Sequence, residues 1–198
     1  DGWTALMFTA QNGGEHGVAM MRLLLDAKAD VDKQNEFGWT ALMHIAVRGG
    51  EHRAGMMRLL LDAGADVNKQ NNEGLTALMF ATEHDCEHGS EMINLLLNSG
   101  ADVNKRNKYG DTALMLAARY GGMHAVEIIS ALIKAKTDVN KQSVHGDTAL
   151  MYTVDTRLMY TVDTIFEGMG TVDTFFENEH RVEIIKILSI LIGQMIIK

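Results

Sequence analysis

Apolar and polar residues follow a pattern along this chain that repeats every 36 residues. Thr-Ala-Leu-Met begins five times at that spacing, at Thr4, Thr40, Thr76, Thr112 and Thr148. The string Ala-Asp-Val keeps the same step at residues 29, 65 and 101, and Thr-Asp-Val follows at residue 137. A constant period of this length is typical of stacked repeat arrays, so the pattern predicts five units that share one architecture.

The second unit shows which elements each repeat is expected to form. Thr40 precedes a small apolar segment over residues 41–46, which Gly49-Gly50 ends, so we expect a short helix with a threonine N-cap. The more apolar residues 56–61 predict a second helix, followed by Gly64 as a residue able to take the left-handed conformation. The charged residues of this second helix are expected to face solvent: Arg53, Arg58 and Asp62.

The turn after the second helix is not the same residue in every unit. Gly64 and Gly100 occupy it in the second and third units, whereas Lys28 and Lys136 occupy it in the first and fourth. We expect all four turns to share one left-handed backbone conformation, which would leave the two lysines strained.

These units resemble the ankyrin repeat. The likeness rests on Gly-x-Thr-Ala-Leu-Met and on Leu-Leu-Leu-Asp-Ala-Gly-Ala-Asp-Val-Asn, and it covers nearly the whole chain. The resemblance implies an all-α solenoid of stacked helix pairs, with β-hairpin fingers roughly at right angles to the helices. It implies one ankyrin-repeat domain over residues 1–198, with units over residues 1–35, 36–71, 72–107, 108–143 and 144–198.

The chain departs from the family pattern in three ways. Alanine stands where the family has proline, and methionine stands where it has histidine, as in Ala5 and Met7 and their equivalents. The polar tie between that histidine and the threonine must be absent, so we expect apolar packing of the methionines to replace it. The period exceeds the usual ~33 residues. The added residues are expected between the two helices, near residues 13–16.

The fifth unit is interrupted. Its string at residues 182–185 matches residues 126–129 at a distance of 56 instead of 36 residues, which places about 20 inserted residues near 152–175. Residues 150–156 recur within this insert as residues 158–164. Two interpretations fit this insert. It is either a duplication by sequence slippage that is tolerated at the surface, or a loop that contacts a partner. The final helix is more apolar than one buried face requires, so we expect further repeats, another domain or a second copy to cover it.

Composition narrows the classes of partner and compartment. The net charge of −8 argues against nucleic acid as the main partner, because phosphate binding needs clustered lysine and arginine. No run of 18 apolar residues exists, so no membrane span is predicted. Cys86 is the only cysteine, which fits an intracellular, cytoplasmic location. The chain begins at Asp1 and not at methionine, which fits a piece of a longer protein.

Histidines suggest a metal site, but their spacing argues against one. Equivalent helices lie about 8–10 Å apart, whereas zinc ligands lie about 2 Å from the ion, so equivalent histidines cannot share a metal. We expect them to be polar ties between neighbouring units at the start of the second helices: His16, His52, His88, His124 and His180. In the third unit, residues 84–88 bring His84, Cys86 and His88 together, which would allow a metal-dependent activity. A fourth ligand from a second stretch is not evident, so no metal and no cofactor is predicted.

Two further polar columns keep the same period. Lysines at residues 33, 69, 105 and 141 are expected to form a solvated row along the fingers. Asparagines at residues 68, 104 and 140 stand in Asp-Val-Asn turns. We expect each to bond its own backbone, although the resemblance also fits substrates of an asparaginyl hydroxylase.

Positions that differ between units are free of the fold and can face a partner. The resemblance implies that finger tips and the outer ends of the first helices line a concave face. Tryptophan, tyrosine and arginine dominate interface energetics. The predicted contact residues are Trp3, Phe37, Trp39, Arg48, Leu75, Tyr109, Asp111, Arg119 and Tyr120. Trp39 is expected to carry the most binding energy and to make few contacts with the core.

These patterns predict a non-enzymatic protein-interaction module or scaffold that binds a partner protein with its concave face. No catalytic residues are predicted, because neither a phosphate-binding loop nor a Ser-His-Asp set is recognisable. The alternative is a recruiting segment of a larger enzyme or effector whose catalytic part lies outside this chain.

Overall fold

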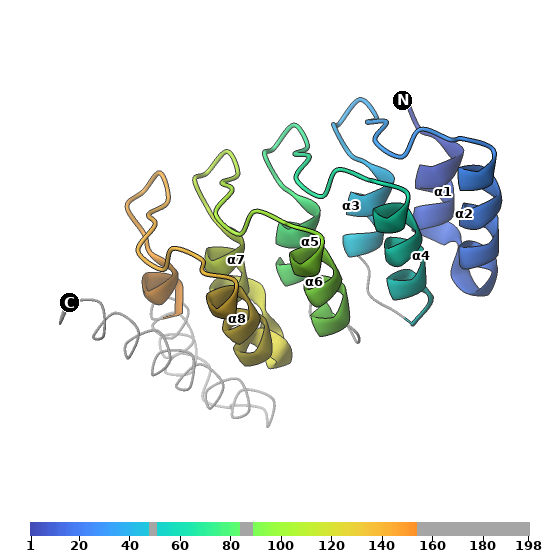
Figure 1. The fold of residues 1–198 in the computed structure, drawn as a ribbon. Helices are drawn as coiled ribbons and strands as arrows, with labels where there is room; N and C mark the ends of the chain where they lie inside the picture. The colour runs from blue at the N-terminus through green and yellow to red at the C-terminus, as the bar shows by residue number, and fades with distance from the viewer. Residues whose placement is uncertain (48–50, 84–88, 154–198) are drawn as a thin grey trace, which may run out of the picture.

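Helix pairs stacked in a row build the protein (Figure 1). The computed structural model describes residues 1–47, 51–83 and 89–153. The first helices of the units are α1 (Ala5–Asn12), α3 (Ala41–Ala46), α5 (Ala77–Glu83) and α7 (Ala113–Tyr120). The second helices are α2 (Gly17–Asp26), α4 (Glu51–Asp62), α6 (Gly89–Asn98) and α8 (Ala125–Lys134). The predicted all-α solenoid of helix pairs is confirmed.

Each Thr-Ala-Leu-Met string begins a first helix. The threonine Oγ1 accepts a hydrogen bond from the methionine backbone N–H three residues later, at 3.3 Å in Thr4–Met7 and 3.4 Å in Thr148–Met151. The expected N-caps are therefore present in the first and fifth units, and equally in the three between them. The methionines pack in the core, at most 1% exposed at Met7, Met43, Met79 and Met115. Apolar packing replaces the family's polar tie at these four positions, as predicted, whereas Met151 of the fifth unit is 52% exposed and the prediction is wrong there.

The residues added to the usual repeat form short 3₁₀ turns between the helices of a pair. These turns are η1 (Gly14–His16) in the first unit and η2 (Gly122–His124) in the fourth. These turns lie between the two helices of a unit, where the additional residues were predicted.

The turn after each second helix has a left-handed backbone. Gly64 and Gly100 have φ of 86° and 84°, and Lys28 and Lys136 have φ of 63° and 64°. The Lys28 backbone N–H donates to the Leu25 carbonyl at 2.9 Å, and the next amide donates to Leu24 at 3.0 Å, which closes the helix. The prediction of one shared conformation is confirmed, and both lysines occupy a region that favours glycine.

We expect Lys28→Gly and Lys136→Gly each to raise the free energy of unfolding by up to ~1 kcal/mol. Relief of left-handed strain is worth about 1–2 kcal/mol, and the greater freedom of glycine in the unfolded chain offsets part of it. Urea denaturation measures the change. Gly64→Lys is the matched reverse substitution, because a Cβ at that position would meet open space, and it should lose a similar amount. If all three variants unfold at the same urea concentration as the parent, the left-handed lysines are not strained.

The fingers are tight loops and not β-hairpins. In the finger between the first two units, the Asn35 N–H donates to the Trp39 carbonyl at 3.1 Å, and the Gly38 N–H donates to the Asn35 carbonyl at 2.9 Å. The described residues contain no strand. The expected strands are absent there because the Asn35 side chain takes the place of a ladder: its Oδ1 accepts from the amides of Phe37 at 3.0 Å and Trp39 at 2.9 Å.

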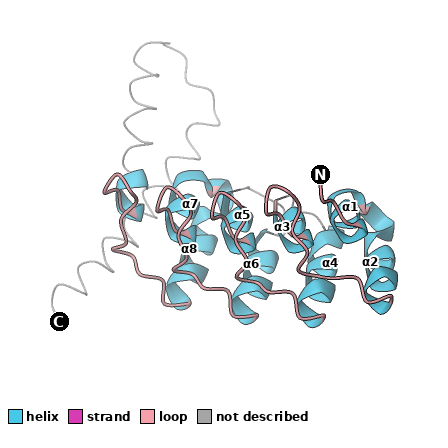
Figure 2. Ribbon diagram, turned by 90° about the horizontal axis from the view of Figure 1, so that it is seen from above, coloured by secondary structure: helices cyan, strands magenta, loops and turns pink. Residues whose placement is uncertain are grey.

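Hydrogen bonds join successive fingers into a row. The Asn72 N–H donates to the Phe37 carbonyl at 3.1 Å, and Val144 donates to Tyr109 at 2.8 Å in the same way. Gly38 has φ of 75°, and a Cβ there would lie 2.7 Å from the Asn72 nitrogen, so glycine allows this close approach. Seen from above, the row lies on the side of the first helices (Figure 2). Finger residues and first helices therefore share one face.

The asparagine column bridges neighbouring units. The Asn68 Oδ1 accepts from the Asp102 N–H at 2.7 Å, and its Nδ2 donates to the Gly100 carbonyl at 3.0 Å. The bond within the turn comes instead from Asp66, whose Oδ1 accepts from the Asn68 N–H at 2.9 Å. The expectation that each asparagine bonds its own backbone is therefore wrong for Asn68, and Asn104 bridges to the next unit in the same way.

Candidate functional site

The first hollow lies between the fingers and first helices of the first two units. Its volume is about 280 Å³. Aromatic side chains and amides line it, together with one valine: Trp3, Gln11, Asn35, Phe37, Trp39, His44 and Val47. Phe37 is 62% exposed at its rim. Three of the predicted contact residues, Trp3, Phe37 and Trp39, thus meet in one place.

Trp39 belongs to a run of stacked rings. Its ring centroid lies 4.3 Å from that of Phe80 and 5.0 Å from that of His44. His44 in turn lies 4.5 Å from Trp3. Phe80 is only 4% exposed, so Trp39 covers part of the core. The expectation that Trp39 makes few core contacts is wrong, because the next unit supplies a ring beneath it.

The second hollow lies between the fingers and first helices of the third and fourth units and reaches the fifth. Its volume is about 240 Å³. It is lined by Glu73, Leu75, Glu83, Asn107, Tyr109, Asp111, Leu116, Arg119, Tyr120, His145 and Tyr152. Tyr109 and Tyr120 are 52% and 46% exposed. Five of the predicted contact residues therefore meet here: Leu75, Tyr109, Asp111, Arg119 and Tyr120.

Asp111 is buried in the wall of the second hollow and accepts a hydrogen bond there. The Tyr152 hydroxyl donates to its Oδ1 at 2.9 Å. Burial raises the pKa of Tyr152, and the bond to Asp111 and the charges of Asp111 and Asp147 raise it further, while Ser143 acts in the opposite direction. The phenol therefore stays protonated at neutral pH and remains a donor to the carboxylate.

Charged side chains surround the tyrosine rings of the second hollow. The Arg119 guanidinium lies 5.1 Å from the Tyr120 ring centroid and 5.3 Å from that of Tyr152. Both distances are typical of cation–π contacts. Lys108 at the rim forms an ion pair with Glu73 of the preceding finger.

The residues of this face that sequence reasoning missed include His44, Leu116 and Tyr152. All three occupy one repeat position, which holds Phe8, His44, Phe80, Leu116 and Tyr152 in successive units. That column varies as the finger positions do, and this variation was the signal that could have found them. Arg48, the remaining predicted contact, lies outside the described residues.

Comparison with known families agrees with the repeat geometry. A family profile described as "Ankyrin repeats (3 copies)" matches residues 6–107 and 86–168. The chain belongs to the ankyrin repeat family. None of the curated proteins compared with it matches. Ankyrin repeats are generally protein–protein interaction modules, and the family is typically non-catalytic.

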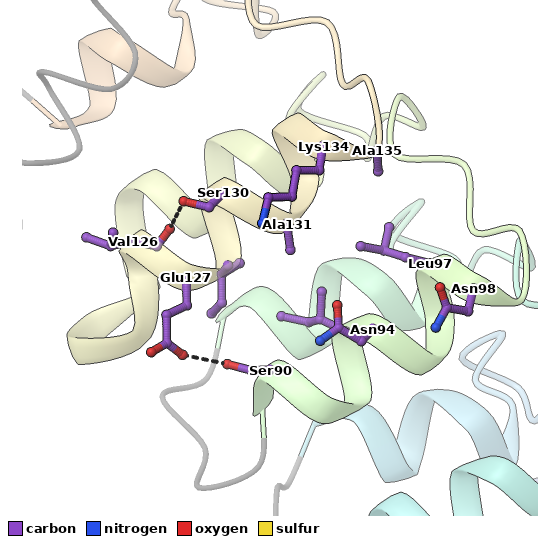
Figure 3. Close-up of a pocket in the computed structure, with 12 residues that line it drawn as sticks. Ser90, Asn94, Leu97, Asn98, Val126, Glu127, Ser130, Ala131, Lys134 and Ala135 are labelled. Carbon is purple, nitrogen blue, oxygen red and sulfur yellow. Dashed lines mark hydrogen bonds between the residues drawn. The ribbon is translucent and has the colours of Figure 1, made fainter.

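Another groove lies among the second helices of this ankyrin array, between α6 and α8 (Figure 3). Its volume is about 670 Å³. Glu127 accepts a hydrogen bond from the Ser90 hydroxyl at 3.0 Å across one end. Ala131 lines the groove where the equivalent residues of the preceding units are Leu59 and Leu95. The smaller side chain accounts for the opening, so this groove is a gap in unit packing.

We expect Ala131→Leu to raise the free energy of unfolding by about 1 kcal/mol. The substitution restores the leucine of the other units and buries part of its side chain against Leu97, at roughly 0.8 kcal/mol per buried methylene. Thermal and urea melts measure the gain. Leu95→Ala makes the reverse change one unit earlier and should be less stable than the parent. A loss of stability in Ala131→Leu would show that the groove is overpacked by leucine.

An apolar hollow of about 590 Å³ lies between α1 and α2 on their outer side. Met20 and Leu23, which line it, are 47% and 70% exposed. The residue equivalent to Met20 in the second unit, Met56, is 1% exposed, and its sulfur lies 2.6 Å from the Cβ position of Gly17 in the first unit. This hollow is thus the face with which a unit packs on the preceding one.

No metal site is found in the described part of the chain. No group of three His, Cys, Asp or Glu side chains there could hold a metal ion. His16 and His52 are exposed, and Nδ1 of His124, the last residue of η2, lies 3.9 Å from the Glu127 carboxylate in α8 of the same unit. The expected ties between neighbouring units are therefore not seen at His16 and His52. The cluster at residues 84–88, with Cys86, lies outside the described residues, as do His180, the insert and the final apolar helix.

Among the helices that the structure describes, none is long and apolar enough to cross a membrane.

Proposed function

We infer that this ankyrin-repeat protein binds a partner protein through its concave face, using the first and second hollows as contact sites. The observation that carries this proposal is the gathering of eight separately predicted residues into two hollows on the same face. Exposed aromatic side chains there, above all Phe37 and Tyr109, have a large area to bury on binding.

The fingers support this function by holding the contact residues in place. Backbone hydrogen bonds link each finger to the next, and the Gln70 side chain donates both to the Gly74 carbonyl at 2.6 Å and to the Arg106 carbonyl at 3.0 Å. Side chains that are fixed before binding lose little conformational entropy when a partner arrives. The row of fingers therefore favours tight binding.

We expect Phe37→Ala and Tyr109→Ala each to weaken partner binding about tenfold or more, because exposed rings at the centre of an interface are typical hot spots. Both rings are more than half exposed, so melting temperatures should hardly change. The partner would be recovered by affinity capture and its binding measured by titration calorimetry. Lys33→Ala, at an exposed lysine outside both hollows, is the matched control and should change affinity little. Parent-like binding by both aromatic variants would reject the concave face as the binding surface.

A further inference from the structure

The two hollows of the concave face differ in charge. Among the described residues that line the first hollow, there is no aspartate, glutamate, lysine or arginine. The described lining of the second hollow contains three carboxylates, those of Glu73, Glu83 and Asp111, and one arginine, Arg119. Lys108 forms an ion pair with Glu73. Within the described residues, the lining of the second hollow therefore carries more carboxylates than cations, whereas that of the first is mainly aromatic.

The tyrosine rings of the second hollow already hold a cation. Three tyrosines line this small volume, and the Arg119 guanidinium lies against the rings of Tyr120 and Tyr152. Arg119 forms no ion pair with a described residue, so the rings are what hold it. Ring faces attract cations electrostatically. The structure therefore shows directly that these faces suit a planar basic group.

Asp111 gives the second hollow a carboxylate acceptor. The residue is 6% exposed, and its Oδ1 accepts from Tyr152. Within the described residues, Oδ2 accepts no hydrogen bond and is not among the fully buried atoms that lack a partner, so it is accessible to solvent. A carboxylate oxygen favours a charged donor. A donor from a bound molecule can therefore reach this oxygen.

We propose that the concave face binds an extended segment of the partner that carries one large apolar side chain and one basic side chain. The apolar side chain enters the first hollow, and an arginine or lysine enters the second. This inference rests on the proposed function. The hollows lie two units apart, and helices of neighbouring units pack about 8–10 Å apart, so the distance between hollows is about 20 Å. An extended chain rises about 3.3 Å per residue, which places the two side chains about six residues apart.

Arg119 has a definite role under this proposal: it competes with the incoming basic group. Its guanidinium occupies the tyrosine ring faces. Its positive charge also repels an incoming basic side chain near the carboxylates. Removing it should therefore strengthen binding of a basic segment, whereas removing an ordinary contact residue weakens binding. This opposite sign distinguishes the proposal from a general loss of contact area.

Peptide phage display on the whole 198-residue chain tests the proposal. Random 16-residue peptides would be selected on the immobilised protein, and the enriched sequences synthesised and measured by fluorescence anisotropy. We expect a shared apolar residue with an arginine or lysine about six positions away. Replacing the basic residue of the peptide by glutamine should weaken binding about tenfold, as the loss of a charge-assisted hydrogen bond.

Variants of the protein then assign the basic residue to its hollow. Asp111→Asn keeps the acceptor for Tyr152 but removes the charge, and should weaken the basic peptide about tenfold. Arg119→Ala should tighten it about threefold to tenfold. Asp62→Asn, which removes the same charge at an exposed site on α4, should have little effect. Thermal melts confirm that each variant is folded.

The outcomes separate this inference from the proposed function. Enriched peptides that lose binding in Phe37→Ala or Tyr109→Ala but share no basic residue would overturn the inference and leave the proposed function standing. Peptides that bind these two variants like the parent would reject both. Selection of no peptide, or a basic peptide that Arg119→Ala weakens, would overturn the inference.

Discussion

Replacing Trp39 with alanine is expected to lower the free energy of unfolding by about 2–4 kcal/mol. Truncating a large aromatic residue that covers a core to alanine typically destabilises a protein by about this amount. The Trp39 ring lies 4.3 Å from Phe80 of the next unit and 5.0 Å from His44 of its own, so its removal opens the packing between two units. Urea denaturation followed by circular dichroism measures the loss.

Two control variants test whether the loss comes from the packing of the Trp39 ring on Phe80. Phe37→Ala removes a neighbouring ring that is 62% exposed, and should change stability by less than about 0.5 kcal/mol. Trp39→Phe keeps a ring against Phe80 and should recover more than half of the loss. If Trp39→Ala unfolds at the parent's urea concentration, the stacked rings do not stabilise the array.

Features that recur with the period could be predicted from the sequence. The threonine N-cap is present in all five units, and the buried methionine and the left-handed turn are present in the first four. Lys28 illustrates the strength of this reasoning. Glycine in two equivalent turns was enough to predict a positive φ at a lysine, and φ there is 63°.

Contacts between units were harder to predict, because the partner atoms belong to a different copy of the repeat. Arg53 was expected to face solvent, yet its guanidinium donates to the Ala10 carbonyl at 2.8 Å and the Gln11 carbonyl at 3.0 Å. It closes the C-terminal end of α1, where a positive charge is favourable. A backbone carbonyl leaves no mark in the sequence, so no pattern of side chains points to this pairing.

Eight of the predicted contact residues line two hollows, and their role in binding stays a prediction. Variation between units pointed to these residues, but not to their division between two hollows that differ in charged side chains. The hydrogen bond from the Tyr152 hydroxyl to Asp111 helps to form the second hollow. The two residues lie 41 positions apart, so the sequence does not indicate that they meet. The unit boundaries and the alternative of a recruiting segment in a larger enzyme or effector stay predictions. A full-length reading frame and limited proteolysis would test them.

Asn71→Ala is expected to lower the free energy of unfolding by about 2–3 kcal/mol and to weaken partner binding at the second hollow. The Asn71 side chain is 7% exposed, and its Oδ1 accepts from the amides of Glu73 at 3.0 Å and Leu75 at 2.8 Å. Alanine leaves two amides of the finger without their acceptor, and each such loss in a buried setting amounts to about 1–3 kcal/mol. The same finger carries Glu73 and Leu75 into the second hollow.

The chain itself shows which replacements should be tolerated. Ser143 holds the equivalent position in the last finger, and its Oγ accepts from the amides of His145 at 3.1 Å and Asp147 at 3.2 Å. Asn71→Asp retains the acceptor oxygen and should change stability by less than about 1 kcal/mol, with Asn71→Ser between aspartate and alanine. Urea melts of the three variants, with calorimetry for binding, give the order. An equal loss in Asn71→Asp and Asn71→Ala would show that the finger depends on the amide nitrogen and not on the oxygen that accepts both hydrogen bonds.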